Sequence, residues 1–179
     1  MSLRRVLSGF IFFFTSLFLG VRIFLIQTYS IEDCYKYDAT EHSQSHGTST
    51  STSYAVYNDF SFNFSDWEVS FDQKIGSQGG AISLEAPSDR SKNVMVSRAS
   101  DGGYGAESNA FNRYMFTSTD DSNYHSIKFV KQGTTLTVYF DSNNHSFTVD
   151  NSFNIARTPK FRLWRSNTAY IKNLKIKEL

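Results

Sequence analysis

The chain has 179 residues and a net charge of +1, with 18 basic and 17 acidic side chains. This length suits one ordinary domain plus a short extra element, and it excludes two full domains. The balanced charge provides no overall field that would attract nucleic acid, and the single cysteine, Cys34, excludes both an intramolecular disulfide and a cysteine-rich zinc site.

Residues 1–28 have the layout of an export signal. Arg4 and Arg5 precede an uncharged apolar stretch, residues 6–21, that is dominated by Phe and Leu. As a helix this stretch reaches about 24 Å, and a hydrocarbon core of about 30 Å is crossed only if the Arg22 side chain extends to the interface.

Several interpretations of this segment stay open. An uncleaved signal anchor is favoured over a cleaved signal peptide because no Ala-x-Ala cleavage site follows the apolar stretch. With an anchor, the positive-inside rule keeps Arg4 and Arg5 in the cytoplasm and places everything after about Tyr29 outside. The alternatives are that residues 10–14 and 23–26 form strands of a soluble protein, or that the segment comes from a mis-started reading frame.

Residues 29–53 are predicted to hold a first strand and then a Ser/Thr-rich linker. The stretch 41–53, EHSQSHGTSTSTS, has no apolar periodicity and is therefore predicted to be an exposed linker or a long loop. His42 and His46 have the i, i+4 spacing that binds a metal on a helix, but Gly47 and the Ser/Thr run argue against a helix there.

Residues 54–179 are predicted to form one antiparallel β-sandwich or barrel. In WEVSFD, residues 67–72, Trp67, Val69 and Phe71 alternate with polar residues, which is typical of a strand with one face in water. The same alternation recurs along the chain, with Gly, Asn and Asp turns between the runs and no convincing helix. The last strand, 170–179, is predicted to have a bulge near Asn173, and its lysines favour a position at a sheet edge.

The stretch YHSIKFVKQGTTLTVYFD, residues 124–141, resembles the central hairpin of the concanavalin A-like lectin and glucanase superfamily, including its laminin-G-like members. WEVSFDQK, residues 67–74, and IKNLKI, residues 171–176, are similar to an early strand and the closing strand of that family. The resemblance covers about residues 54–179 and implies a jelly-roll sandwich. A weaker likeness, on residues 31–38, connects the chain to sandwich modules of phage and prophage tail fibres and surface proteins.

No catalytic constellation is evident in the sequence, and we expect a protein that is not an enzyme. A glucanase of that family needs the pattern Glu-x-Asp-x-x-Glu, which is absent here, while Glu68 and Asp72 are four residues apart on one strand. His125 and His145 do not occur near a nucleophile-elbow motif, so we expect both to be surface residues. No cofactor is expected, and the residues that could bind calcium are Asp120 and Asp121.

Sugar binding requires aromatic faces together with polar groups that exchange hydrogen bonds with hydroxyls. The predicted loops offer such residues, and the candidate carbohydrate-binding residues are Tyr104, Asn109, Arg113, Trp164 and Arg165.

The preferred hypothesis is a recognition or adhesion module on a cell or virion surface that binds a glycan or a surface protein. Membrane attachment through residues 1–28 and homo-oligomer formation are both compatible with it. The alternatives are a structural module of a phage tail or surface assembly without a sugar ligand, and a relic of a glycoside hydrolase. Fold alone does not decide among these, because this architecture serves binding, catalysis and assembly.

Overall fold

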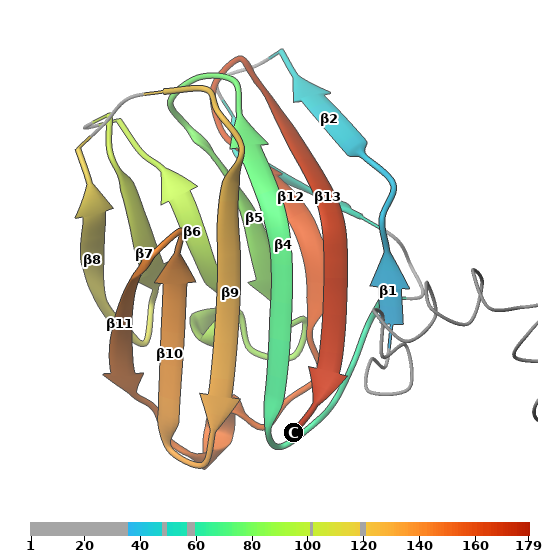
Figure 1. The fold of residues 1–179 in the computed structure, drawn as a ribbon, viewed down its shortest axis with the longest axis vertical. Helices are drawn as coiled ribbons and strands as arrows, with labels where there is room; N and C mark the ends of the chain where they lie inside the picture. The colour runs from blue at the N-terminus through green and yellow to red at the C-terminus, as the bar shows by residue number, and fades with distance from the viewer. Residues whose placement is uncertain (1–35, 48–49, 57–59, 101, 119–120) are drawn as a thin grey trace, which may run out of the picture. The chain divides into compact units, whose positions relative to one another are not determined.

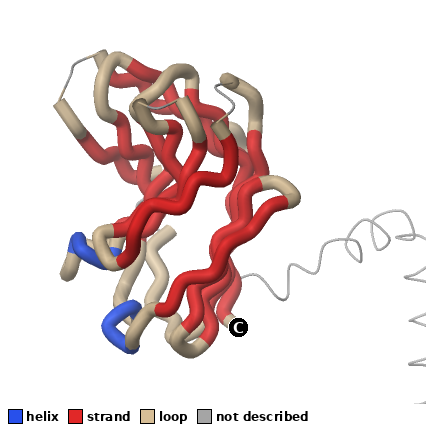
Figure 2. The backbone as a smooth tube through the Cα atoms, turned by 90° about the vertical axis from the view of Figure 1, so that its left-hand side faces the viewer, coloured by secondary structure: helices blue, strands red, loops and turns tan. Residues whose placement is uncertain are grey.

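The computed structural model describes residues 36–47, 50–56, 60–100, 102–118 and 121–179, which form two antiparallel sheets packed face to face (Figures 1 and 2). The predicted antiparallel β-sandwich is therefore confirmed. The predicted signal segment, 1–28, lies outside the described residues. Within the described part, no helix has the length and apolar character needed to cross a membrane.

The first sheet contains seven of the strands in the described residues, and it is the front sheet in Figure 1. Its order is β1-β13-β4-β9-β10-β11, and β2 also pairs with β13. The strands are β1 (Lys36–Asp38), β2 (His42–His46), β4 (Trp67–Ile75), β9 (His125–Gln132), β10 (Thr135–Phe140), β11 (Asn143–Thr148) and β13 (Asn167–Glu178).

The second sheet contains the other six strands of the described residues, in the order β3-β12-β5-β6-β7-β8. Two single turns of 3-10 helix, η2 (Arg90–Lys92) and η3 (Asn151–Phe153), interrupt the connections between strands. The strands are β3 (Thr52–Ala55), β5 (Gly80–Glu85), β6 (Val94–Arg98), β7 (Tyr104–Ser108), β8 (Phe111–Thr117) and β12 (Thr158–Leu163).

The core lies between the sheets, as the two-residue alternation of the sequence predicts. Every second residue of β4 is buried, and Trp67 has no exposed surface. At the far end of β4, the buried Gln73 donates to the Val96 carbonyl at 2.9 Å and accepts from the Ile82 amide at 3.2 Å. This single amide side chain therefore connects the first sheet to two strands of the second.

The predicted hairpin is present as β9 and β10, which pair from Gln132 with Thr135 to Ile127 with Phe140. Gly133, in the turn, has φ +53°, a left-handed conformation that glycine adopts without strain. Asp141 follows β10 with φ +49° and accepts a hydrogen bond from the Ser126 amide at 2.8 Å, which closes the second end of the hairpin.

A bulge interrupts β13 where the sequence predicts it. The pairing of β13 with β4 shifts between Lys172 and Lys175, and Asn173 has φ +55°. The expectation of an edge position is wrong, because β13 pairs with β4 on one side and with β1 and β2 on the other. Its lysines instead point to the outer face of the first sheet, opposite the core residues Leu174 and Ile176.

The Ser/Thr-rich segment is not only a linker, which corrects the prediction for 41–53. Residues 42–46 form β2 beside β13, and residues 52–55 form β3 beside β12. Neither strand needs an apolar face of its own, because each adds main-chain hydrogen bonds to the edge of an existing sheet. The sandwich therefore begins no later than Lys36 rather than at Tyr54.

Candidate functional site

An open hollow of about 690 Å³ lies at the end of the sandwich where β4 ends and β13 begins, at the top of Figure 1. Lys74 and Tyr170 are register partners on the outer face of the first sheet, and both line this hollow. The remaining surface comes from small hydroxyl and amide side chains, two glycines and the imidazole of His46. The lining residues are Ser45, His46, Gly47, Lys74, Gly76, Ser77, Ser122, Ser166, Asn167, Thr168 and Tyr170.

Asn167 fixes the wall of this hollow. The side chain is 7% exposed, and its Oδ1 accepts from the amides of Ser77 at 2.9 Å and Thr168 at 2.7 Å. Its Nδ2 donates to the Ser77 carbonyl at 2.9 Å. One amide group therefore holds the β4–β5 turn against the start of β13, so the hydroxyls of the hollow have defined positions.

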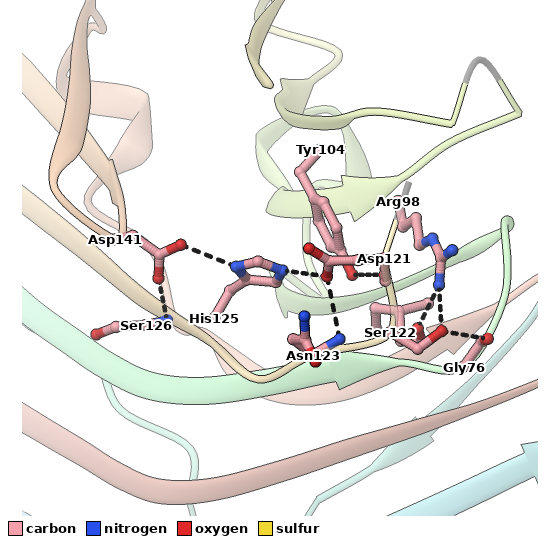
Figure 3. A network of polar contacts seen from close by, with 10 residues as sticks. Gly76, Arg98, Tyr104, Asp121, Ser122, Asn123, His125, Ser126 and Asp141 are labelled. Atoms are coloured by element: carbon pink, nitrogen blue, oxygen red, sulfur yellow. Dashed lines mark hydrogen bonds and ion pairs between the residues drawn. The ribbon is translucent and has the colours of Figure 1, made fainter. Parts of the chain in front are cut away.

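A second hollow of about 480 Å³ adjoins the first and shares Gly76, Ser77 and Ser166 with it. Arg98 and Arg165 supply its positive charge. The Arg98 Nη1 atom donates to the Ile75 carbonyl at 2.7 Å and to Ser122 Oγ at 3.0 Å, so its guanidinium is held by the protein (Figure 3). Arg165 is exposed and has φ +70°.

Three residues after Ser122, which lines the first hollow, His125 lies between two carboxylates (Figure 3). Its Nδ1 is 2.8 Å from Asp141 Oδ2, and its Nε2 is 2.9 Å from Asp121 Oδ1. The ring also stacks on Phe140, with 4.6 Å between centroids. His125 is largely buried rather than a surface residue, and neither ring nitrogen is left to accept a proton from a serine hydroxyl.

Two further groups at this end have shifted pKa values. The hydrogen bond from the Asn123 amide, together with the contact to His125, lowers the pKa of Asp121. Burial and a hydrogen bond to Glu41 raise the pKa of Tyr124 well above its ordinary value of 10. Tyr124 is therefore a neutral hydroxyl donor over the whole physiological range.

The residues predicted to bind carbohydrate do not converge on one surface. Tyr104 is fully buried in β7, where its hydroxyl donates to the Asp121 carbonyl at 3.1 Å, so its ring cannot stack on a sugar. Asn109 lies in the exposed turn after β7, at the opposite end of that strand. Arg113, on β8, forms an ion pair with Glu107 at 3.0 Å.

The other two candidates, Trp164 and Arg165, lie beside the hollows. Arg165 lines the second hollow, and the amide of the partly exposed Trp164 donates to the Gly79 carbonyl of the adjoining turn at 2.9 Å. Of the calcium candidates, Asp120 lies outside the described residues and Asp121 is held by Asn123 and His125. Within the described ranges, no three His, Cys, Asp or Glu side chains are grouped to hold a metal ion.

Sequence reasoning missed the residues that make the first hollow, above all Lys74, Tyr170 and Asn167. The available signal was the recurrence of Lys and Tyr at the polar positions of predicted strands. Polar positions of a half-buried strand predict a solvated face, and only the register of β4 with β13 shows that Lys74 and Tyr170 adjoin.

The comparisons with known proteins show the fold alone. No family model and no curated protein matches the sequence. Among solved structures, a carbohydrate-binding module, CBM66 from Bacillus subtilis, is similar with a TM-score of 0.55 and 13% identity, covering 79% of this chain and 97% of that one.

Two larger proteins contain a similar sandwich. A sialidase matches with a TM-score of 0.59 and 10% identity over 77% of this chain and 15% of its own. The tail fibre protein gp63.1 from a phage of E. coli matches with a TM-score of 0.56 and 10% identity, over 78% of this chain and 21% of its own. The shared architecture is a jelly-roll sandwich that occurs in binding modules, enzymes and tail fibres alike.

Proposed function

We propose that this chain is a non-catalytic recognition module that binds carbohydrate in the hollow formed by Lys74 and Tyr170. One observation carries the proposal: the aromatic ring of Tyr170 shares an open surface at one end of the sandwich with small hydroxyl and amide side chains, Lys74 and His46. Sugars are recognised by such combinations, since an aromatic ring contacts their C–H faces while polar groups exchange hydrogen bonds with their hydroxyls.

The fold likeness supports this proposal without carrying it. The match to CBM66 covers nearly all of that module, so the two chains share an entire sandwich rather than a fragment. The sialidase match, in contrast, covers a small part of a much longer enzyme.

The arrangement of acids and bases favours binding over catalysis. His125 engages a carboxylate at each ring nitrogen, which leaves it unsuited to activate a nucleophile. Glu68 and Asp72 lie on one strand four residues apart, a separation of about 13 Å along the strand that is too long for paired carboxylates of a glycosidase.

Binding of a glycan implies that the sandwich works outside the cytoplasm, on a cell or virion surface. The basic and apolar start of the sequence agrees with export or anchoring. A glycan or a glycosylated surface protein is then the partner.

A glycan array probed with the labelled full-length protein tests the proposal. We expect a saccharide hit that Tyr170→Ala abolishes, because the substitution removes the ring of the hollow. Tyr114→Ala is the matched control, since Tyr114 is 38% exposed and lies on β8 of the other sheet. Loss of the hit in both variants, or in neither, would contradict the assignment of the hollow, and circular dichroism establishes that each variant is folded.

The second candidate function is a structural module of a tail or surface assembly. The fold likeness to a phage tail fibre favours it, together with the exposed side chains of Tyr114 and Met115 on the edge strand β8. Light scattering separates the two candidates: a stable oligomer that dissociates on Met115→Glu, without any glycan hit, supports the assembly module.

A further inference from the structure

Lysine and tyrosine side chains are interleaved over the outer face of the first sheet. The Lys74 ammonium is 5.0 Å from the ring centre of Tyr170 and 5.8 Å from that of Tyr124, and Lys172 is 4.0 Å from Tyr124. Two further pairs repeat the contact, Lys128 over Tyr139 at 4.2 Å and Lys175 over Tyr37 at 5.4 Å. We call the eight residues the Tyr–Lys face: Tyr37, Lys74, Tyr124, Lys128, Tyr139, Tyr170, Lys172 and Lys175.

The strand register places part of this face in a straight row across the sheet. Tyr37 of β1 lies opposite Lys175 of β13, which lies opposite Ser70 of β4. Ser70 lies opposite Lys128 of β9, which lies opposite Tyr139 of β10. At about 4.8 Å between neighbouring strands, this row extends for about 19 Å. The hollow with Tyr170 and Lys74 adjoins it farther along β4 and β13.

Aromatic rings are the main neighbours of three lysines of this face. Asp72 lies opposite Lys172 in the register, but its Oδ2 accepts from the Asn173 side-chain amide at 2.7 Å. In the part of the chain that the structure describes, the ammonium groups of Lys74, Lys128 and Lys172 contact aromatic rings rather than carboxylates.

The second sheet differs in this respect. On its outer face Lys160 pairs with Glu85 at 3.5 Å, and Arg113 pairs with Glu107 at 3.0 Å. On the outer face of the first sheet, by contrast, the lysines outnumber the two carboxylates of β4, Glu68 and Asp72; these lysines are Lys74, Lys128, Lys172, Lys175 and Lys177.

A lysine held over an aromatic ring is well prepared to bind an anion. The ring attracts the ammonium and keeps the methylene stem extended, which lowers the conformational entropy lost on binding. The ammonium has three N–H donors, and contact with the ring leaves them able to donate hydrogen bonds to an anion. Several such groups on one sheet face match a chain that carries negative charges at intervals.

We propose that the ligand of this module is an acidic polysaccharide, whose carboxylate or sulfate groups bind the lysines of the Tyr–Lys face while one sugar occupies the Tyr170 hollow. This inference rests on the proposed function and names its ligand class. It accounts for two features together: a polar hollow for a sugar, and lysines held over aromatic rings on the adjoining face of the first sheet.

Affinity electrophoresis of the full-length protein tests the ligand class. The gels contain alginate as a uronate polymer, chondroitin sulfate as a sulfated polymer, or dextran as a neutral one. We expect retardation by at least one acidic polymer that weakens as salt rises, because the contacts are exposed and screened. The double variant Lys128→Gln and Lys172→Gln should weaken this binding roughly tenfold, on the scale of two exposed charge contacts.

Three controls make the outcomes distinct. Lys160→Gln removes one positive charge from the opposite sheet and should leave binding unchanged, while Lys128→Arg with Lys172→Arg should retain most of it. Equal retardation by dextran, equal loss in Lys160→Gln, or equally tight binding of single-stranded DNA would overturn the acidic saccharide as ligand. If a neutral glycan binds in a Tyr170-dependent way, this inference fails and the proposed function stands; if no saccharide binds, both fail.

Discussion

Arg157 provides a sharp test of how this sandwich is stabilised. Its side chain has no exposed surface and lies between the sheets, 5.4 Å from the ring of Trp67. The Nη1 atom donates to the Lys92 carbonyl at 2.6 Å and to the Leu84 carbonyl at 3.4 Å, and Nη2 donates to the Phe153 carbonyl at 3.4 Å. The guanidinium is therefore a buried cation whose hydrogen-bond partners here are neutral carbonyls.

Burial lowers the pKa of Arg157 to about 10 from its ordinary 12.5. One pKa unit corresponds to about 1.4 kcal/mol, so burying the charged guanidinium lowers the free energy of unfolding by roughly 3 kcal/mol. Because the folded pKa lies below the unfolded one, this cost is fully present below about pH 10 and decreases only as the pH rises from 10 toward 12.5. The short hydrogen bond to the Lys92 carbonyl stabilises the folded state by about 1.5 to 3 kcal/mol, and the longer hydrogen bonds contribute little.

These opposing terms nearly cancel, so replacing the charge by an apolar side chain of similar length should cost little. We expect Arg157→Met to change the free energy of unfolding by less than about 2 kcal/mol. Arg157→Ala also leaves a cavity beside Trp67 and should be less stable than the Met variant by a further 2 to 4 kcal/mol or so.

Equilibrium unfolding in urea, followed by tryptophan fluorescence, measures both values, since Trp67 becomes exposed when the core opens. Arg162→Met, a partly exposed arginine on β12, is the control and should change stability by at most about 0.5 kcal/mol. If the Met variant loses as much stability as the Ala variant, the hydrogen bonds of the guanidinium outweigh its desolvation and the reasoning above is refuted.

Three further changes test other parts of the structure. Gly79 has φ +98°, and a Cβ there would collide with the Trp164 carbonyl. Gly79→Ala should therefore lower the free energy of unfolding by about 2 kcal/mol or more and displace the turn that borders the hollows. Thermal unfolding measures this loss, and an unchanged midpoint temperature would contradict the prediction. The lowered pKa of Asp121 means that its contribution to stability is complete above its unfolded pKa, near 3.8, and is lost as the pH falls below that value. Asp121→Asn should remove this pH dependence, which urea unfolding at several acidic pH values measures, and an unchanged dependence would contradict the prediction. Phe71 is 2% exposed and contacts Phe129, so Phe71→Ala should cost about 3 to 5 kcal/mol in urea unfolding, and a cost below about 1 kcal/mol would refute its core position.

The strands of the core could be predicted because their chemistry repeats every two residues. Trp67, Val69 and Phe71 alternate with polar neighbours and form β4, and the hairpin turn at Gly133 follows from a residue that tolerates positive φ. The bulge at Asn173 was predictable for the same reason, since Ile171 and Leu174 can face the core together only if an extra residue lies between them.

The edge strands β2 and β3 could not be predicted from this signal. Their sequences, HSQSH and TSYA, lack the alternation of apolar residues, and their pairing depends on main-chain groups that β13 and β12 offer. The information that selects these strands therefore lies in distant parts of the chain.

The candidate site was predicted only in part. Arg165 and Trp164 lie beside the hollows, but Tyr104 belongs to the core because glycines around it let the strand pack closely rather than open a loop. Lys74 and Tyr170 are 96 positions apart in the sequence, and no local pattern indicates that β4 and β13 are neighbours. A surface formed by the polar sides of several strands can be recognised only when the register between those strands is known.

The bulge in β13 also protects the edge of the first sheet from other chains. Because β13 changes register between Lys172 and Lys175, the segment beside it is divided, with β2 covering residues 167–171 and β1 covering 174–176. Among the described residues, the outermost border on this side is thus two short pieces of five and three residues with a bend at Thr40, whose amide is capped by Asp38. A divided sheet edge is a poor template for pairing with a strand of another molecule. The bulge that turns the lysines outward should therefore also help this sheet, rich in Lys and Tyr, to resist aggregation at high concentration.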